Sequence, residues 1–382
     1  MRQQEKIKVL EDLIAIESVN DHELEVAEYL ATFLGRFGIK TKIDRFDGQR
    51  ANLIAEIGKK KTDQIFCLTG HQDTVAVGTQ DKWKTDPFKA TIIGERIYGR
   101  GSADMKSGLA AEAIVLAELA ASGWNPPGTL RLLATAGEEY GTPGAYRLAK
   151  QGLVDDVNAL VVGEPTSGQI VYAHAGTINY QIQSFGKSVH SSRPEAGINA
   201  ISGLNAYLTA EEHLFDQAPR DPDLGAFKHS ITRTSGGNQI NIIPDQAVLF
   251  GNLRPTPAFP NQKVIQMIKN QVSAINELSR FQLQFKLLHN FYPVKTAADD
   301  LFVQTAAAIS AKHFANQVIG LTTINGATDA SVFVERNPQI KAIILGPDAW
   351  ENAHQNNEFT TLPSFLATIK TYRDLVKAYF AV

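Results

Sequence analysis

Cysteine is nearly absent from this chain, long hydrophobic runs are missing, and neither sign of charge dominates. The single cysteine among 382 residues, Cys67, excludes an internal disulfide and a cysteine-rich zinc site. The 37 Lys and Arg residues nearly balance the 40 Asp and Glu residues and form no basic block, so we expect no nucleic-acid partner. The most apolar helix candidate, residues 108–121, contains two glutamates and is too short to cross a bilayer.

These absences also bear on location. Residues 1–34 interleave charged and apolar residues at helical spacing without a continuous apolar segment, so we expect neither a signal peptide nor an anchor. A chain that cannot form an internal disulfide is suited to a reducing compartment. We therefore expect a cytoplasmic protein without a membrane partner.

The residues that are present form an ordinary globular mixture, with 43% hydrophobic and 20% charged residues. A chain of this length predicts two domains rather than one. Short apolar runs at 63–70, 129–137 and 158–163 alternate with helical segments, and polar or glycine-rich sequence follows each run. This alternation is typical of an α/β domain.

From about Thr177 the pattern changes. A strand, a helix, a hairpin over 238–255, a second helix and a last strand follow one another, which predicts an inserted α+β unit of ferredoxin-like type. After about Phe291 the α/β pattern returns. We therefore expect a discontinuous domain at 1–175 and 292–382, with an inserted domain at 176–291.

Acidic residues and histidines follow the predicted strands closely, where open α/β sheets bind their ligands. Asp73 comes two residues after His71 in extended chain, so its side chain is expected on the same side, where it can orient the imidazole. Asp104 lies in a glycine-rich turn before a helix, yet neither phosphate-binding motif is complete there. The whole set consists of His71, Asp73, Asp104, Glu138, Glu139, Glu164 and His354.

Part of this set has the composition of a two-metal site. Mixed nitrogen and oxygen ligands suit two divalent ions, Zn²⁺ in the first place and Co²⁺ or Mn²⁺ as alternatives. Two adjacent ions can activate water and polarise a carbonyl, which predicts metal-assisted hydrolysis. Without a cation so many acids in one cleft would repel one another. The predicted ligands are His71, Asp104, Glu139, Glu164 and His354.

Several ordered motifs resemble those of one family across nearly the whole chain. They are TGHQDTV, YGRGSADMKSG, AGEEYGTPG, VVGEP, GKSVHSSRPEAGINAI and NIIPDQAVLFGNLRP, together with His354. The family is that of the zinc-dependent amidohydrolases and exopeptidases, which includes succinyl-diaminopimelate desuccinylase, acetylornithine deacetylase, aminoacylase and glutamate carboxypeptidase. The resemblance implies an α/β zinc-exopeptidase-like catalytic domain with a mixed sheet flanked by helices, plus an inserted ferredoxin-like lid and dimerisation domain.

The same resemblance implies roles for individual residues. His71 and Glu164 would bind one zinc ion and Glu139 and His354 the other, with Asp104 as the bridge. Glu138 would be the general base, and a cis peptide bond would join Asp104 to Met105. In the inserted domain of a homodimer, His190 would reach the partner's site. Substrate contacts are expected from Asn241, from Arg254 to an α-carboxylate, and from Thr328 and Asp329 in a second loop.

The substrate is the point at which the resemblance divides. The well-known desuccinylases have paired arginines where this chain has Ala173 and His174. We favour N-succinyl-L,L-diaminopimelate, cleaved to succinate and L,L-diaminopimelate in lysine biosynthesis, because GHQDTVAVG, GSADMKSG and NGATDASVF resemble desuccinylase sequences. The alternatives are an acetylornithine deacetylase, a broader N-acyl-amino-acid hydrolase or dipeptidase, an inactive ligand-binding homologue and a flavodoxin-like nucleotide binder.

Overall fold

The computed structural model describes residues 1–381, which divide into two compact units. Unit 1 contains Met1–Tyr172, Lys295–Thr322 and the chain from Thr328 onward, and unit 2 contains Ala173–Val294 and Thr323–Ala327. The predicted bounds at 175/176 and 291/292, and the catalytic and lid roles of the two parts, stay predictions.

The frame of unit 1 is a mixed sheet in the strand order β1-β2-β6-β3-β7-β17-β8-β15, with β16 paired to β8. The central strands β6, β3, β7 and β17 run parallel to one another. Strand β2 is antiparallel to both of its neighbours, β1 and β6. The strands span Thr41–Phe46 (β1), Arg50–Gly58 (β2), Ile65–His71 (β3), Thr129–Thr135 (β6), Ala159–Val162 (β7), Ile170–His174 (β8), Val294–Lys295 (β15), Leu321–Ile324 (β16) and Lys341–Ile344 (β17).

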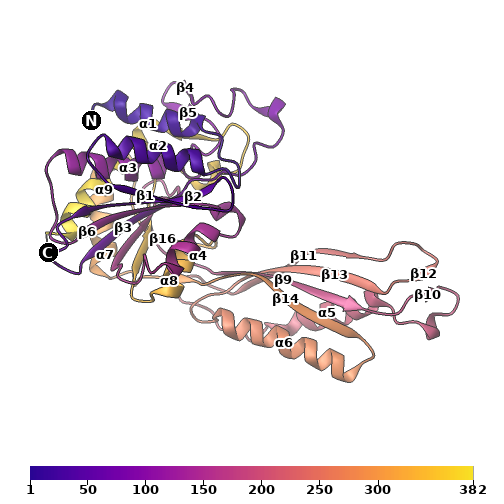
Figure 1. The fold of residues 1–382 in the computed structure, drawn as a ribbon. Helices are drawn as coiled ribbons and strands as arrows, with labels where there is room; N and C mark the ends of the chain where they lie inside the picture. Colours follow the sequence, from indigo (N-terminus) through magenta and orange to yellow (C-terminus); the bar gives the residue numbers. More distant parts are fainter. Residues whose placement is uncertain (382) are drawn as a thin grey trace. The chain divides into compact units, whose positions relative to one another are not determined.

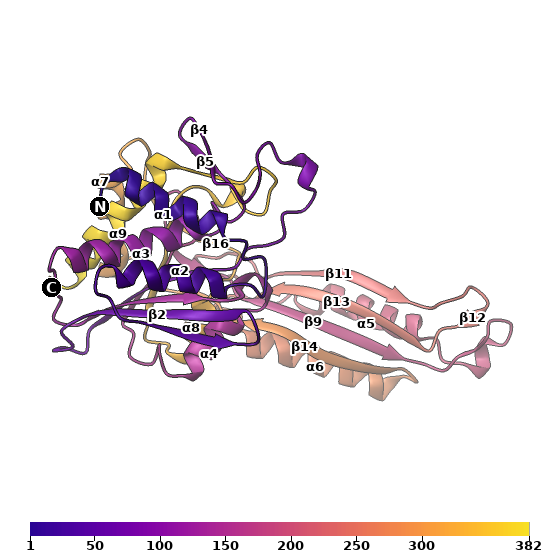
Figure 2. The ribbon, with the colours of Figure 1, turned by 45° about the horizontal axis from the view of Figure 1, so that its top comes forward.

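Helices cover both faces of this sheet (Figures 1 and 2), which confirms the predicted fold class. Helices α2 and α3 lie over one face, and α4 and α8 lie over the other. Helices α1 and α9 pack on α3, and α7 packs on α9. Their bounds are Gln3–Ala15 (α1), Leu24–Gly35 (α2), Lys106–Ala121 (α3), Pro143–Lys150 (α4), Leu301–His313 (α7), Ala330–Arg336 (α8) and Leu362–Tyr379 (α9).

Burial on both faces explains why the central strands are continuous apolar runs. Every residue of β3, β6 and β7 is buried, as parallel strands between two helical layers require. Helix α3 approaches β7 so closely that a Cβ atom on Gly108 would lie 1.8 Å from the carbonyl oxygen of Gly163. Among the described residues, no helix combines the length and hydrophobicity that a membrane span needs.

A smaller antiparallel sheet and three short 3₁₀ helices complete unit 1. Strand β5 pairs with both β4 and β18. The bounds are Thr91–Ile93 (β4), Arg96–Tyr98 (β5), Phe359–Thr361 (β18), Gln80–Lys82 (η1), Glu138–Tyr140 (η2) and Trp350–Asn352 (η4).

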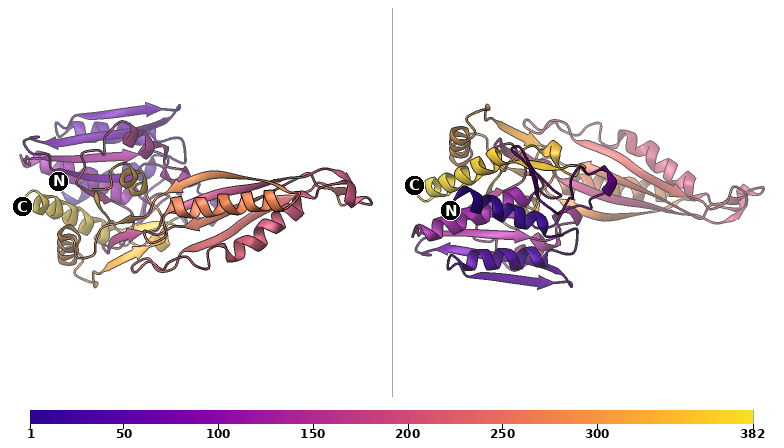
Figure 3. Two further views of the ribbon diagram at one scale, coloured as in Figure 1. Left: turned by 90° about the horizontal axis from the view of Figure 1, so that it is seen from below. Right: turned by 90° about the horizontal axis from the view of Figure 1, so that it is seen from above.

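Unit 2 is a four-stranded antiparallel sheet in the order β11-β13-β9-β14, with two helices side by side on one face (Figure 3). The order strand, helix, two strands, helix, strand is the expected ferredoxin-like arrangement. Tyr180, Tyr207 and Leu249 belong to its own buried core. The elements are Thr177–Phe185 (β9), Val189–His190 (β10), Pro194–Ala196 (η3), Ala200–Leu214 (α5), Lys228–Gly236 (β11), Ile242–Ile243 (β12), Gln246–Arg254 (β13), Asn261–Leu278 (α6) and Gln282–Phe291 (β14).

The hairpin predicted over 238–255 is wrong. Its first half, β12, pairs with β10, and β13 pairs instead with β11 and β9. Pro244 lacks the N–H group that a continuing ladder would need, so it separates β12 from β13. Strand β11 is a largely exposed, polar edge strand, and it therefore carries no hydrophobic alternation by which it could be recognised.

Candidate metal centre

The parallel strands of unit 1 bring three sequence segments to one edge of the sheet. His71, the last residue of β3, is paired with Thr135, the last residue of β6, and Thr69 is paired with Val162, the last residue of β7. Glu138 begins η2 three residues beyond β6, and Glu164 follows β7 by two residues. Parallel register alone therefore places these chain segments next to one another.

The five predicted ligands meet at this edge. Asp104 is central, because its Oδ1 lies 2.9 Å from His71 Nε2 and its Oδ2 lies 3.2 Å from His354 Nε2. Glu164 Oε1 is 3.6 Å from the same His71 nitrogen, and Glu139 Oε1 is 2.8 Å from His354 Nε2. The ligand pairs expected for two ions are thus adjacent, with the aspartate between them.

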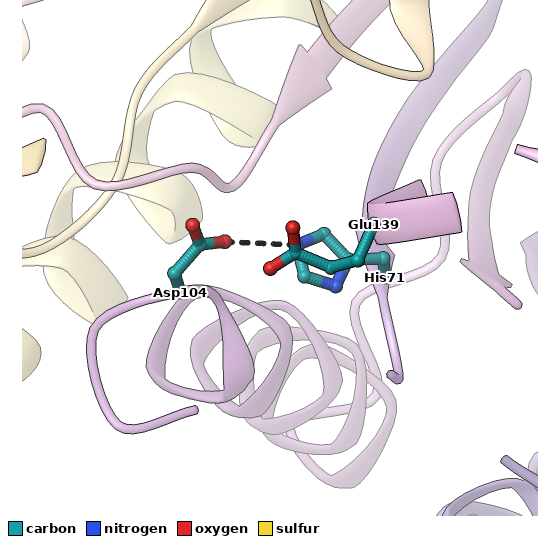
Figure 4. Close-up of side chains that lie close together, drawn as sticks. All are labelled: His71, Asp104 and Glu139. Carbon is teal, nitrogen blue, oxygen red and sulfur yellow. Dashed lines mark hydrogen bonds and ion pairs between the residues drawn. The ribbon is translucent and has the colours of Figure 1, made fainter. Parts of the chain in front are cut away.

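The donor set fits divalent cations. One ligand atom each from His71, Asp104 and Glu139 lies within 4.8 Å of the others, and Figure 4 shows these side chains pointing toward one another. The buried Oε2 of Glu164 has no hydrogen-bond partner within residues 1–381, so it is an orphaned acceptor. A cation would satisfy this oxygen and neutralise the surrounding acids.

The electrostatics of the cluster reflect crowded acids. Burial raises the pKa of Glu164 and of Glu139, and the charge of Asp104 raises both further. Burial acts to raise the pKa of Asp104 as well, but hydrogen bonds with His354 and His71 lower it below its ordinary value. The imidazoles therefore form hydrogen bonds with the acids where bound cations would otherwise contact them.

The two histidines carry the opposite shift. Burial by itself would lower the pKa of His71, but the charges of Glu164, Asp73 and Asp104 raise it well above its ordinary value. Hydrogen bonds with Asp104 and Glu139 raise the pKa of His354 to about 10. Both rings thus compensate negative charge, a task that a bound divalent ion would take over.

Asp73 contacts His71 differently from the expectation. The main-chain oxygen of Asp73 lies 2.9 Å from His71 Nδ1, whereas its carboxylate Oδ1 is 3.6 Å away. Because a carbonyl only accepts, Nδ1 donates in this contact, and Nε2 can then serve as a ligand. The Asp73 carboxylate instead accepts the N–H groups of Gly137, Glu138 and Glu139 at 2.8, 3.1 and 3.1 Å.

The turn that presents Glu138 and Glu139 is therefore held from one side by Asp73. It also requires Gly137, which has a φ of 78° and lies against Arg50, where a Cβ atom would be 2.0 Å from Nη2. Burial raises the pKa of Glu138 well above its ordinary value, and the charge of Asp329 adds to the effect.

The Asp104 turn contains the predicted cis bond between Asp104 and Met105. It also contains a contact that the sequence did not indicate, because Glu358 accepts the N–H of Asp104 at 3.1 Å and pairs with Arg100 at 2.5 Å. Arg100 lies within the YGRG motif, but Glu358 belongs to no motif. Its only sequence signal is its position four residues after His354.

Thr328 and Asp329, which are predicted to belong to a second substrate-side loop, are buried in unit 1. Thr328 Oγ1 accepts the N–H of Ala330 at 3.3 Å, and Thr328 is only 1% exposed. The adjacent Asp329 accepts a hydrogen bond from Thr135 at 2.5 Å, and burial raises its pKa to about 6.

The remaining predicted residues lie in unit 2. His190 is exposed, and its Nδ1 is within 2.8 Å of Ser192 Oγ. Asn241 is near it, since its neighbour Ile242 pairs with His190. Arg254 is at the other end of unit 2, at the end of β13, where its half-buried guanidinium donates to Thr177 Oγ1.

The chain matches a known protein family and curated relatives along most of its length. The model of the family described as Peptidase family M20/M25/M40 matches residues 67–378. A probable succinyl-diaminopimelate desuccinylase of Staphylococcus aureus (strain MSSA476) is 33% identical over 398 residues, which cover 97% of each chain. The acetylornithine deacetylase of Pasteurella multocida (strain Pm70) is 29% identical over 339 residues, covering 87% of this chain and 85% of the relative.

Solved structures show the same fold. The M20 family metallo-carboxypeptidase Sso-CP2 from Sulfolobus solfataricus superposes with a TM-score of 0.83 at 19% identity, covering 99% of this chain and 100% of that one. A Bacillus subtilis protein described as a dinuclear metal binding peptidase from the M20 family has a TM-score of 0.74 at 18% identity, covering 99% and 98%.

Proposed function

Because the chain belongs to the peptidase family M20/M25/M40 and is a metal-dependent amidohydrolase, we propose that it hydrolyses the amide bond of an N-acyl amino acid. The observation that carries this function is the meeting of two histidine and carboxylate pairs on either side of Asp104. The preferred substrate is N-succinyl-L,L-diaminopimelate, cleaved to succinate and L,L-diaminopimelate for lysine biosynthesis. A desuccinylase relative at 33% identity across 97% of the chain supports this choice.

The proposed activity requires two divalent ions at this site. His71 and Glu164 would hold one, His354 and Glu139 the other, and Asp104 would contact both. Zn²⁺ suits this mixed nitrogen and oxygen set, with Co²⁺ or Mn²⁺ as alternatives. When bound, the ions lower the pKa of a water molecule and polarise the scissile carbonyl.

Glu138 is the proton carrier in this reaction. As the water oxygen bonds to the acyl carbon, the Glu138 carboxylate takes the proton, and it delivers that proton to the amine nitrogen when the C–N bond breaks. Burial raises the pKa of Glu138, which suits a group that must both accept and release a proton. The N–H contact with Asp73 keeps the Glu138 main chain in place beside the ligands.

Arg254 is the proposed anchor for the substrate's α-carboxylate. Within residues 1–381 its guanidinium donates to the Thr177 hydroxyl and forms no ion pair with a carboxylate, and burial lowers its pKa. A half-buried cation that is paired only with a hydroxyl favours an anionic ligand that can accept two parallel hydrogen bonds. Asn241 and Thr328 would supply further substrate contacts.

The positions of His190 and Arg254 within unit 2 support a homodimer. Strand β13 ends at Arg254, whereas Asn241 and the neighbouring His190 precede its start at Gln246. Nine residues of extended chain span about 26 Å, which is longer than one acylated amino acid. If both residues act on one substrate, they come from two chains, and His190 then stabilises the developing oxyanion in its partner's site.

The alternative substrate is N-acetylornithine, because an acetylornithine deacetylase is 29% identical over 87% of the chain and because no paired arginines stand at Ala173 and His174. The related alternative is a broader N-acyl-amino-acid hydrolase or dipeptidase. Each differs from the preferred function in the acyl group or side chain and not in the proposed chemistry.

The test combines metal analysis with a substrate series. We expect about two divalent ions per chain, loss of activity with a chelator and return of activity with Zn²⁺. The value of kcat/KM for N-succinyl-L,L-diaminopimelate is then compared with those for N-acetylornithine and dipeptides. A tenfold preference for another substrate, about 1.4 kcal/mol, would replace the succinyl assignment. Full activity without a stoichiometric metal would overturn the mechanism itself.

A further inference from the structure

Arg100 and Glu358 form a buried ion pair beside the proposed ligands without belonging to them. Arg100 Nη1 lies 2.5 Å from Glu358 Oε2, and the two side chains are 3% and 0% exposed. Desolvating two charges is costly, and such a pair often stabilises a fold no better than apolar residues of the same volume. The groups that the pair contacts therefore indicate a contribution other than stability.

Each member of the pair holds the main chain of a segment that carries a ligand. Glu358 Oε1 accepts the N–H groups of Ala103 at 2.9 Å and of Asp104 at 3.1 Å. Arg100 Nη1 donates at 3.3 Å to the carbonyl of Gln355, which directly follows His354. Its Nη2 donates at 3.1 Å to the carbonyl of Ala76.

These contacts join two segments that are distant in sequence. Asp104 and His354 are separated by about 250 residues of chain, and His354 lies in a turn, with a φ of 61° and a half-exposed side chain. No regular element carries His354, since η4 ends at Asn352 and β18 begins at Phe359. Strand β18 is paired with β5 next to these turns, but the turn of His354 itself contacts the Asp104 segment through Arg100 and Glu358. The spacing between the two ligands therefore depends in part on these two side chains.

We propose that Arg100 and Glu358 are positioning residues of the metal site, which set the distance between Asp104 and His354 and thereby the affinity for the ion on the His354 side. This inference rests on the proposed function for the identity of the ligands. Groups that orient metal ligands typically change metal affinity by about 10- to 100-fold when they are altered. The same range is expected here.

A purely structural role is the alternative, and the chain offers a matched control for it. Arg131 in β6 is also buried, at 6% exposure against 2% for Arg100, and it likewise combines carboxylate and carbonyl acceptors, although its carboxylate partners are more exposed than Glu358. It contacts Glu56 at 2.8 Å, Asp156 at 2.7 Å and the carbonyl of Leu153 at 2.5 Å. None of these partners is a proposed ligand or adjacent to one.

The experiment compares Arg100→Lys, Glu358→Gln and Arg131→Lys in the full chain. Each metal-free protein is titrated with Zn²⁺ by calorimetry, and its unfolding temperature is measured alongside. We expect Arg100→Lys to bind one of the two ions at least about tenfold less tightly than Arg131→Lys, because lysine cannot reach Glu358 and two carbonyls together. Glu358→Gln should cross the same threshold, since its amide group no longer pairs with Arg100 as a charge.

A Zn²⁺ affinity in the folded Arg100→Lys or Glu358→Gln protein that stays within tenfold of the Arg131→Lys value would overturn the proposal. Comparison with wild type then shows whether no variant lost affinity or all lost it equally through general destabilisation. If Arg100→Lys does not fold, the nearly isosteric Glu358→Gln decides by the same threshold. Failure of the wild-type chain to bind Zn²⁺ would refute the proposed function instead.

Discussion

The metal-side residues of unit 1 and the substrate-side residues of unit 2 are built in contrasting ways. In unit 1, His71 and Glu164 are buried, and every predicted ligand contacts another predicted ligand. In unit 2, His190 is exposed and, among residues 1–381, its ring forms hydrogen bonds only with Ser192, two residues away, while Arg254 pairs with a hydroxyl. The first set is organised by the fold itself, whereas the second, in the proposed function, depends on a substrate or a second chain.

The strongest test of this contrast is Glu138→Gln, which should lower kcat by about 10² to 10⁴-fold while the metal content stays unchanged. Glutamine preserves the shape of the side chain and the main-chain contact with Asp73 but cannot carry the proton. Steady-state kinetics and elemental analysis on the same sample measure both quantities. Glu139→Gln is the control, because it should reduce metal affinity instead. Turnover near the wild-type value in Glu138→Gln would refute the assignment of the base.

A second test alters unit 2 alone. Arg254→Gln should lower kcat/KM for substrates with a free α-carboxylate by about 10- to 100-fold, because a charge-assisted pair is lost. For the matching methyl ester, which cannot form that pair, the variant and the wild type should differ little. An equal loss on both substrates would show that Arg254 affects the site in some way other than carboxylate binding.

A third test asks whether two chains share a site. His190→Ala and Glu138→Gln proteins are each nearly inactive, but in a hybrid dimer one site has both groups. After equal mixing and subunit exchange, about a quarter of all sites should be active. Mass spectrometry checks the exchange. Exchange without any return of activity would place His190 outside the partner's site.

The smallest effect is expected from Glu164→Gln in metal-free protein. The pKa of Glu164 is raised in the fold, first by burial, so its ionisation opposes folding. This penalty grows as the pH rises above the ordinary carboxyl pKa toward the raised pKa of the folded state. At pH 8 the free energy of unfolding of the neutral variant should therefore exceed that of wild type by roughly 1 kcal/mol, which thermal unfolding can measure. The difference should shrink toward pH 4. With Zn²⁺ bound, wild type should instead be the more stable protein, because the Glu164→Gln variant lacks one of the metal ligands. A wild-type protein that is more stable in both states would contradict the repulsion.

Strand-end reasoning placed His71 and Glu164 in the cluster, because a strand end is a local feature of sequence. The apolar run before His71 and the one before Glu164 mark their own ends, and parallel strands present those ends at one edge. Sequence reasoning failed to predict strand β11, whose exposed polar sequence shows no alternation of apolar and polar residues. It also missed Glu358, since a lone buried carboxylate without a motif does not differ in sequence from an exposed one.

The sequence by itself determined the α/β order, the ferredoxin-like order of unit 2 and the identity of the residues at the sheet edge, because periodicity and motif spacing are local properties of the chain. Only the tertiary structure decided the partner of each group. The Asp73 carboxylate accepts the main-chain N–H groups of residues 137–139, whereas the His71 ring donates to the main-chain oxygen of Asp73. Arg100 and Glu358 join turns about 250 residues apart. Such partners are selected when burial obliges each polar atom to find the nearest donor or acceptor, and that distance exists only in the folded chain.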